Sequence, residues 1–106
     1  MAIEVVNTLK AVRLDDVRTD VMLKRRLHSW LLCFAKPGQK DKMHAHNEDE
    51  TFYCVQGECT MSFPDGTKSV MTPGMIALIP GGEFYQLENT GNEPMVLLGK
   101  IGRAHV

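Results

Sequence analysis

The fold of this chain is decided by residues 38–57, which read GQKDKMHAHNEDETFYCVQG. His44 and His46 stand two positions apart, and side chains at that spacing face the same side of an extended strand. A rise of roughly 3.4 Å per residue puts them about 7 Å apart, so both imidazoles can converge on one ion. A short polar turn follows, and the next strand begins at Glu50. If the chain doubles back at that turn, the carboxylate of Glu50 lies beside the two imidazoles.

These three side chains are candidate metal ligands. Two imidazoles and one carboxylate form a facial triad that leaves coordination positions open for a substrate or for oxygen. The spacing of the histidines alone is a weak signal, because two histidines near a loop are more often solvated than metal-bound. Glu48 or Asp49 could also supply the carboxylate in place of Glu50. Strand alternation puts Phe52 and Cys54 on the face of Glu50, so the ligand face continues as a core face.

The residues around the triad resemble two motifs of a known family, the cupin superfamily. Its first motif is a glycine, five residues, HxH, three or four residues, a glutamate, six residues and a glycine. All defined positions are matched within residues 38–57, by Gly38, His44, His46, Glu50 and Gly57. The second motif is a glycine, five residues, PxG, two residues, a histidine, three residues and an asparagine. Within residues 74–89 it is matched by Gly74, Pro80, Gly82 and Asn89.

The resemblance implies an all-β fold, a single-domain cupin-type jelly-roll β-barrel of the RmlC-like kind over residues 1–106. It also implies that His44, His46 and Glu50 bind one divalent transition metal: Fe2+, Zn2+, Ni2+ or Mn2+. Two motifs in order are specific for the fold. They are far less specific for function, because cupins range from oxygenases and isomerases to storage proteins and sensors.

The second motif departs from the family at one position, where Tyr85 replaces the histidine that is usually the fourth ligand. Alternation puts Tyr85 on the same face as Leu87 and Asn89, so its side chain is expected to point inward. Three roles are open to it. The phenol could bind the metal, it could exchange a proton beside the metal with its pKa lowered from about 10 by the cation, or it could be a core tyrosine. We expect the second role, which makes Tyr85 the candidate catalytic residue.

Glycine and proline cut the chain into strand-length segments, which favours a sandwich or a small barrel over a helical domain. β-Branched, aromatic and aliphatic residues predict strands at 27–35, 51–55, 59–63, 68–71, 75–79, 83–88 and 95–101. Residues 2–14 could form an opening strand or a short helix. Any other helix is expected near residues 15–20.

Composition excludes several classes of partner. The 106 residues include 12 basic and 13 acidic ones, with a formal net charge of -1. Nucleic-acid binding needs a clustered basic surplus, and no apolar run is long enough to span a membrane. The three cysteines are odd in number and lack CxxC spacing, so reduced buried thiols are expected. With no recognisable signal peptide, these features predict a cytoplasmic protein.

Two classes of function follow. The first is a metal-dependent enzyme acting on a small polar metabolite, either by dioxygenation with iron(II) or by Lewis-acid chemistry with zinc, nickel or manganese. Lewis-acid chemistry would make it a lyase, isomerase, dehydratase or cyclase, with Tyr85 or Glu48 moving a proton. The second class is a non-catalytic cupin that binds or senses a small molecule. His28 could line the pocket in either case if its face of the strand points inward.

A homodimer is expected as well. A barrel of this length gains from burying more of its surface. Cupins commonly pair through edge strands, often with an N-terminal strand that crosses over. Residues 2–14 are the candidate crossing strand.

Overall fold

This computed structural model describes residues 3–24 and 27–102. These residues contain eight strands and one short helix. The elements are α1 (Thr8–Ala11), β1 (Arg18–Lys24), β2 (Leu27–Phe34), β3 (Glu50–Gln56), β4 (Cys59–Ser62), β5 (Lys68–Met71), β6 (Ile76–Ile79), β7 (Gln86–Asn89) and β8 (Met95–Gly102). The prediction of an all-β jelly-roll chain is confirmed. None of the helices among these residues is long and apolar enough to cross a membrane.

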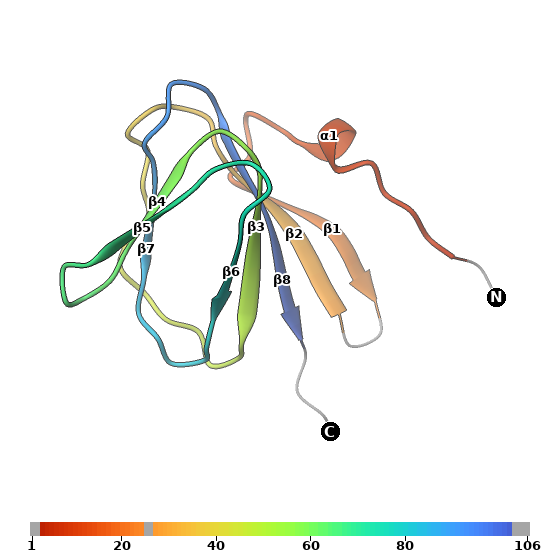
Figure 1. Cartoon of the computed structure of the whole chain (residues 1–106). Coiled ribbons are helices and arrows are strands. Elements are labelled where there is room, and N and C mark those ends of the chain that lie inside the picture. The colour runs from red at the N-terminus through yellow and green to blue at the C-terminus, as the bar shows by residue number, and fades with distance from the viewer. Residues whose placement is uncertain (1–2, 25–26, 103–106) are drawn as a thin grey trace.

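The strands form two antiparallel sheets that face each other (Figure 1). The larger sheet has the order β1-β2-β8-β3-β6, and the smaller has the order β5-β4-β7. The two sheets keep separate hydrogen-bond ladders, so the expected barrel is open rather than continuous. The segment between β2 and β3 connects the layers, because Lys40 pairs with Glu88 and His44 pairs with Tyr85 in isolated bridges. This connection positions the predicted site.

The first part of the chain agrees with the prediction only in part. A short helix forms within residues 2–14, one of the two alternatives, at Thr8–Ala11, where the side chain of Asn7 accepts a hydrogen bond from the backbone N–H of Leu9 at 3.1 Å. The helix expected near residues 15–20 does not form. Residues 18–24 form β1, an edge strand that pairs with β2 and carries a register shift between Asp20 and Met22. Charged residues and this irregularity interrupt the apolar alternation that would have predicted a strand.

Alternation along the strands builds the core between the sheets. Glu50, Phe52 and Cys54 all point inward from β3, as predicted, and Leu87 and Asn89 do so from β7. Cys33, Cys54 and Cys59 are buried free thiols, which confirms that prediction. Burial raises the pKa of Cys59 to about 12, so this thiol stays protonated at neutral pH.

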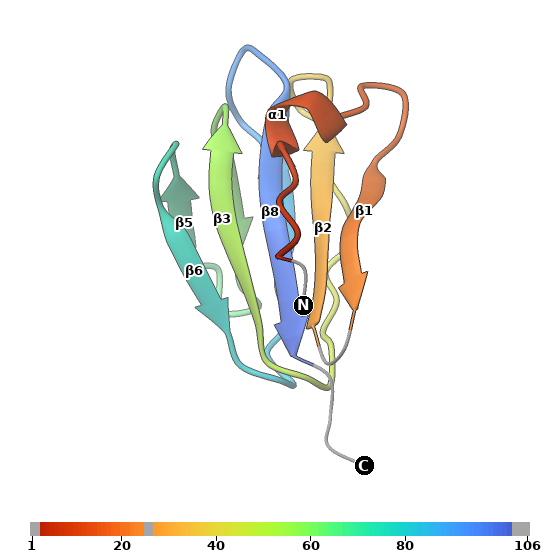
Figure 2. The same cartoon turned by 90° about the vertical axis from the view of Figure 1, so that its right-hand side faces the viewer.

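A second apolar cluster lies on the outer face of the larger sheet. It is built on Leu31, Cys33 and Val96, against which Ala11 and Val12 pack at the end of α1. Figure 2 shows α1 and the residues before it in front of this face. The segment therefore covers part of the sheet that the other layer does not.

Candidate functional site

All four predicted site residues gather where the connection between β2 and β3 meets the start of β7. The backbones of His44 and Tyr85 exchange two hydrogen bonds, each with an N–O distance of 2.9 Å. His44 lies in an isolated bridge and His46 in the loop that follows. The two histidines were expected on a regular strand, but they lie on an extended segment instead. Glu50 begins β3.

The second glycine-rich motif holds this loop in place. The N–H of Gly82 donates to the carbonyl oxygen of His46 at 2.7 Å, and the N–H of Gly81 donates to Oδ1 of Asp49 at 2.8 Å. A Cβ atom on Gly81 would lie 2.2 Å from the carbonyl oxygen of Asn47, so only glycine fits there. Asp49 therefore serves the loop, and Glu50 is the carboxylate that faces the imidazoles.

The two imidazoles lie side by side and close to Glu50. Their ring centroids are 5.0 Å apart, and Nε2 of His46 is 3.9 Å from Oε1 of Glu50. Nδ1 of His44 is 2.6 Å from the carbonyl oxygen of Lys42, an atom that can only accept. The proton therefore sits on Nδ1, which leaves the lone pair on Nε2 available for a ligand bond.

Tyr85 reaches the carboxylate and not solvent. Its hydroxyl donates to Oε1 of Glu50 at 2.5 Å, and the two residues are 1% and 2% exposed. No donor from residues 3–24 or 27–102 reaches the other oxygen, Oε2, although it is buried. Burial and the bond to Glu50 raise the pKa of Tyr85, while the charge of Arg18 acts in the opposite direction. In this arrangement the phenol is a hydrogen-bond donor.

The donor set suits a divalent transition metal, because imidazole nitrogens and a carboxylate oxygen are its usual protein ligands. As the side chains stand, no three histidine, cysteine, aspartate or glutamate groups in the described part of the chain enclose a possible cation position. Oε1 of Glu50 is engaged by Tyr85, and Oε2 has no partner. The backbone brings the triad together, and the side chains converge on an ion only if this carboxylate reorients.

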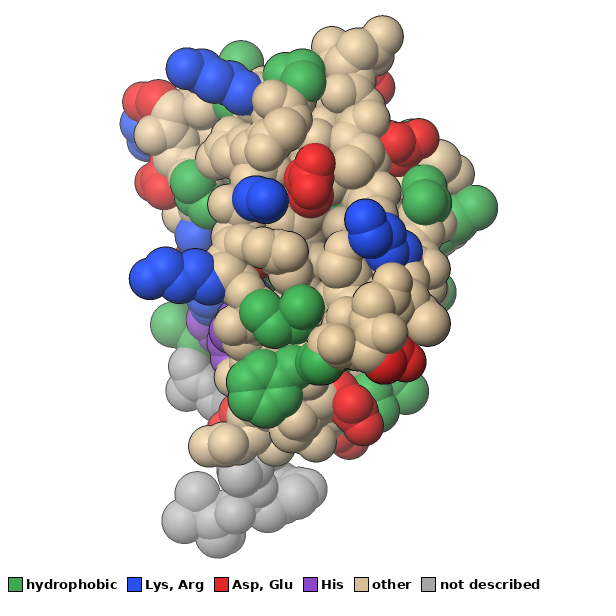
Figure 3. Space-filling view, turned by 90° about the vertical axis from the view of Figure 1, so that its left-hand side faces the viewer, with side chains coloured by type: hydrophobic (Ala, Val, Ile, Leu, Met, Phe, Trp, Pro, Cys, Tyr) green, Lys and Arg blue, Asp and Glu red, His purple; other side chains and the backbone are tan. Residues whose placement is uncertain are grey.

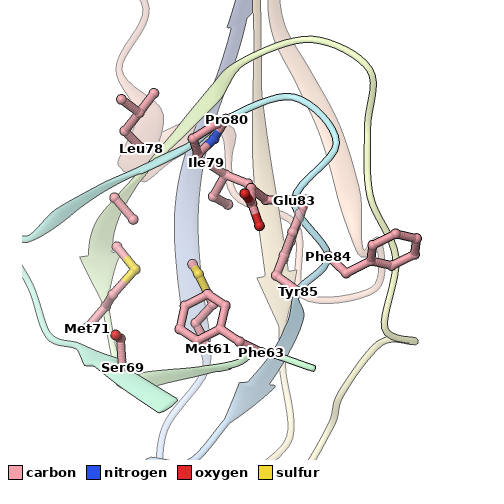
Figure 4. Close-up of a pocket in the computed structure, with 11 residues that line it drawn as sticks. Met61, Phe63, Ser69, Met71, Leu78, Ile79, Pro80, Glu83, Phe84 and Tyr85 are labelled. Atoms are coloured by element: carbon pink, nitrogen blue, oxygen red, sulfur yellow. The ribbon is translucent and has the colours of Figure 1, made fainter. Parts of the chain in front are cut away.

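Two cavities meet at Tyr85. The larger, about 440 Å³, lies between the two sheets and is walled mainly by apolar side chains such as Met61, Phe63 and Met71. Figure 4 shows Glu83 and Tyr85 at the same cavity, with the ring of Phe84 turned away from it. The smaller, about 120 Å³, lies on the imidazole side. A tyrosine at this position therefore separates an apolar space from the candidate metal ligands.

The smaller cavity contains residues that the sequence analysis did not select. Arg18 and Trp30 line it together with Asp41 and both imidazoles. Arg18 was missed because residues 18–24 were not predicted as a strand, and nothing in the sequence places β1 beside the first motif. Figure 3 shows histidine side chains reaching the surface, bordered by basic and apolar side chains.

Asp41 and His28 have structural partners. Oδ1 of Asp41 accepts the N–H of Leu87 at 2.8 Å, and burial raises the pKa of this carboxyl. His28 lies on the inward face of β2, as suggested, but its Nε2 is 2.8 Å from Oδ1 of Asp20. It lines neither of the two cavities that meet at Tyr85.

Comparison with known proteins agrees with this architecture. Residues 31–99 match the family described as the cupin domain. Over 62 residues, 58% of this chain, the sequence is 34% identical to gentisate 1,2-dioxygenase from a Ralstonia species. The match covers only 18% of that enzyme, so most of it has no counterpart here.

Solved structures share the fold. A conserved protein with a double-stranded β-helix domain from Klebsiella pneumoniae superposes with a TM-score of 0.83 at 21% identity, covering 95% of this chain and 90% of that one. An RmlC-like cupin protein from Desulfovibrio desulfuricans gives 0.81 at 22% identity, covering 95% and 97%. Likenesses at this level of identity establish the fold alone.

Proposed function

This chain belongs to the cupin domain family, and we propose that it is a metal-dependent enzyme that acts on a small polar metabolite. In this proposal His44, His46 and Glu50 bind one divalent transition metal, which is Fe2+, Zn2+, Ni2+ or Mn2+. Such an ion supplies either a site for oxygen and a chelating substrate or a Lewis acid that polarises a carbonyl. Both routes need coordination positions that the protein leaves open, and a triad of ligands leaves them.

The observation that carries the proposal is the unmatched oxygen of Glu50. A carboxylate that is 2% exposed, with one oxygen lacking any donor among the described residues, is costly to bury. A cation beside the two imidazoles would supply the missing partner. Glu50 and the two histidines also occupy the glutamate and histidine positions of the first cupin motif.

Tyr85 contributes to chemistry in this proposal. Its hydroxyl is the donor nearest to Glu50, and its ring lines both cavities. If Glu50 turns toward an ion, the phenol is released from its present partner. It can then donate its hydrogen bond, or its proton, to a substrate oxygen bound on the imidazole side.

A non-catalytic binding cupin is the second candidate, and one observation favours it. The hydrogen bond from Tyr85 satisfies one oxygen of Glu50 without any cation. A chain that rests in this arrangement could capture a small molecule and leave it unchanged.

The cellular location and the oligomeric state belong to the same proposal. Three buried free thiols suit a reducing compartment, and we infer that the protein works in the cytoplasm. Exposed apolar side chains on the larger sheet and at the start of the chain favour a homodimer.

Elemental analysis of protein purified without added metal tests the proposal. We expect iron, zinc, nickel or manganese at near one ion per chain. His46→Ala should reduce the metal content to near background while the circular dichroism spectrum is unchanged. His28→Ala is the matched control and should keep its metal, because His28 pairs with Asp20 away from the triad. Unchanged metal in His46→Ala would place any ion elsewhere.

A further inference from the structure

We propose that Arg18 is the anchor for a carboxylate group on the molecule that this site takes. The inference deepens the proposed function and rests on it in one respect, that the imidazole side of Tyr85 is where a ligand sits. It names the chemical class of that ligand, a small carboxylic acid.

The position of Arg18 follows from strand pairing. It begins β1 opposite Leu32, beside the strand that carries Trp30. Its side chain lines the same cavity as His44, His46 and Tyr85. A positive charge thus stands on the wall that faces the candidate metal ligands, on a paired strand and not on a free loop.

The guanidinium is held in place but keeps its donors. Its Cζ lies 4.5 Å from the ring centroid of Trp30, a cation–π contact that orients the planar group. Its ion pair with Asp20 is long, 3.9 Å from Nε to Oδ1, because that oxygen is closer to Nε2 of His28, at 2.8 Å. Among the described residues nothing accepts a hydrogen bond from the side chain of Arg18. Most of its five N–H donors are therefore available.

The shape and charge of the cavity select the ligand. Guanidinium binds carboxylate through two parallel hydrogen bonds, a geometry that few other groups match. A space of about 120 Å³ equals roughly four water molecules in the liquid, so the acid must be small there or project into solvent. Asp41 also faces this cavity, but its Oδ1 accepts the N–H of Leu87 and its Oδ2 is 4.0 Å from Nδ1 of His44. The oxygens of Asp41 thus have partners within the protein, whereas the side-chain N–H donors of Arg18 have no hydrogen-bond acceptor among the described residues.

Trp30 provides a direct readout, because it is the only tryptophan of the chain and carries the stacked guanidinium. The probes are acetate and lactate, with lactamide as the neutral counterpart of lactate, titrated at constant ionic strength. We expect a saturable change in tryptophan fluorescence with both acids and none with lactamide. Arg18→Gln should weaken binding by about 10- to 100-fold, the usual range for a lost charged hydrogen bond. The affinity of Arg18→Lys should lie between those of Arg18→Gln and the wild type, because lysine keeps the charge but loses the paired donors.

Arg13→Gln is the matched control, since Arg13 pairs with Asp15 on the surface and should leave binding unchanged. Titrations that superimpose for Arg18→Gln and wild type overturn the inference, and so does equal binding of lactate and lactamide. Metal content and thermal unfolding of each variant separate this result from the proposed function. Loss of lactate binding with metal retained supports both. Binding that depends on Arg18 in a protein that holds no metal supports the inference and contradicts the proposed function.

Discussion

Tyr85 changes the site because a phenol carries its own proton where an imidazole would offer a lone pair. In the structure the Tyr85 hydroxyl donates that proton in a hydrogen bond to Oε1 of Glu50, the oxygen that also faces His46. The ring is as deeply buried as the core residues around it, so its hydroxyl has few other partners. Tyr85 and the proposed metal ion would therefore compete for one carboxylate.

Tyr85→Phe tests this competition. It keeps the ring and removes the only hydrogen-bond donor to the Glu50 carboxylate among the described residues, so metal-free protein should lose about 1–3 kcal/mol of unfolding free energy. Protein loaded with metal should lose less, because the ion then partners the carboxylate. Urea unfolding with and without a chelator measures both values. If the hydroxyl also moves a proton, turnover falls by about 10²–10⁴-fold while metal stays bound. Loss of metal would show instead that the phenol is a ligand, and unchanged stability, metal and turnover would leave it as ordinary core.

Asp20 gives a prediction with a defined pH dependence. The hydrogen bond from His28 and the nearby charge of Arg18 lower the pKa of Asp20. Because the folded pKa is lower than the unfolded one, Asp20 stabilises the protein above the unfolded value of about 3.9 and loses that effect as the pH falls through the folded value. Asp20→Asn should lower the free energy of unfolding by about 0.2–1 kcal/mol at pH 7, because the pair of Asp20 and His28 is partly exposed. The loss should become smaller as the pH falls below about 4. Urea unfolding between pH 7 and 3 measures the difference, and a gap that widens toward low pH would contradict the assignment.

The part of the site that comes from neighbouring residues in the sequence was predictable. The part that strand pairing brings together from distant residues was not. His44, His46 and Glu50 fall within seven residues of one another, so alternation and one turn suffice to bring them together. Arg18 reaches the same cavity only through the pairing of β1 with β2. The hydrogen bond between Tyr85 and Glu50 joins residues 35 positions apart, and no local pattern predicts it.

At the scale of the strands, β8 shows how tightly the large sheet packs. A Cβ atom on Gly99 would lie 2.5 Å from the six-membered ring of Trp30 and 3.0 Å from Phe52. Glycine is needed here for space, because the indole lies directly over the backbone of β8. The same indole supports the guanidinium of Arg18, so packing in β8 and charge at the cavity are linked through Trp30.

Gly99→Ala should therefore destabilise the protein by about 1–3 kcal/mol, the cost of overpacking a core. Gly102→Ala on the same strand is the control, because no atom of the described residues lies within 4 Å of its Cβ position. Thermal or urea unfolding compares the two variants. The tryptophan emission of Gly99→Ala should shift as well, because the indole must move. Equal stability in both variants would mean that Trp30 moves aside without cost.

The strands that the sequence predicted share one property: turn residues separate them and apolar residues fill them. β1 fits this description poorly, because it is an irregular edge strand in which Arg18, Asp20 and Lys24 flank its three apolar residues. Its edge position tolerates such residues, because one side of the strand has no neighbouring strand to pair with. Tertiary pairing with β2, and not local sequence, makes it a strand.

Over the whole molecule, apolar surface is concentrated on the large sheet and at the start of the chain. Ile76 and Leu78 of β6 are 66% and 67% exposed, and Ile3 and Val5 are 90% and 89% exposed. The residues before α1 lie in front of this sheet but do not cover its β6 edge (Figure 2). A second copy would cover both regions at once, with the first residues of each chain placed against the sheet of its partner.

We therefore predict a dimer by light scattering at high micromolar concentration. Leu78→Lys should weaken or abolish it, because a leucine that is buried on association contributes about 1.5–3 kcal/mol and the change occurs twice in a two-fold interface. Val70→Lys is the matched control. Val70 is also an exposed apolar residue, but it lies on β5 in the smaller sheet. The Val70→Lys substitution should leave the mass measured by light scattering unchanged if the large sheet forms the interface. A wild-type protein of monomeric mass would refute the dimer, and dissociation by Val70→Lys but not by Leu78→Lys would move the interface to the other sheet.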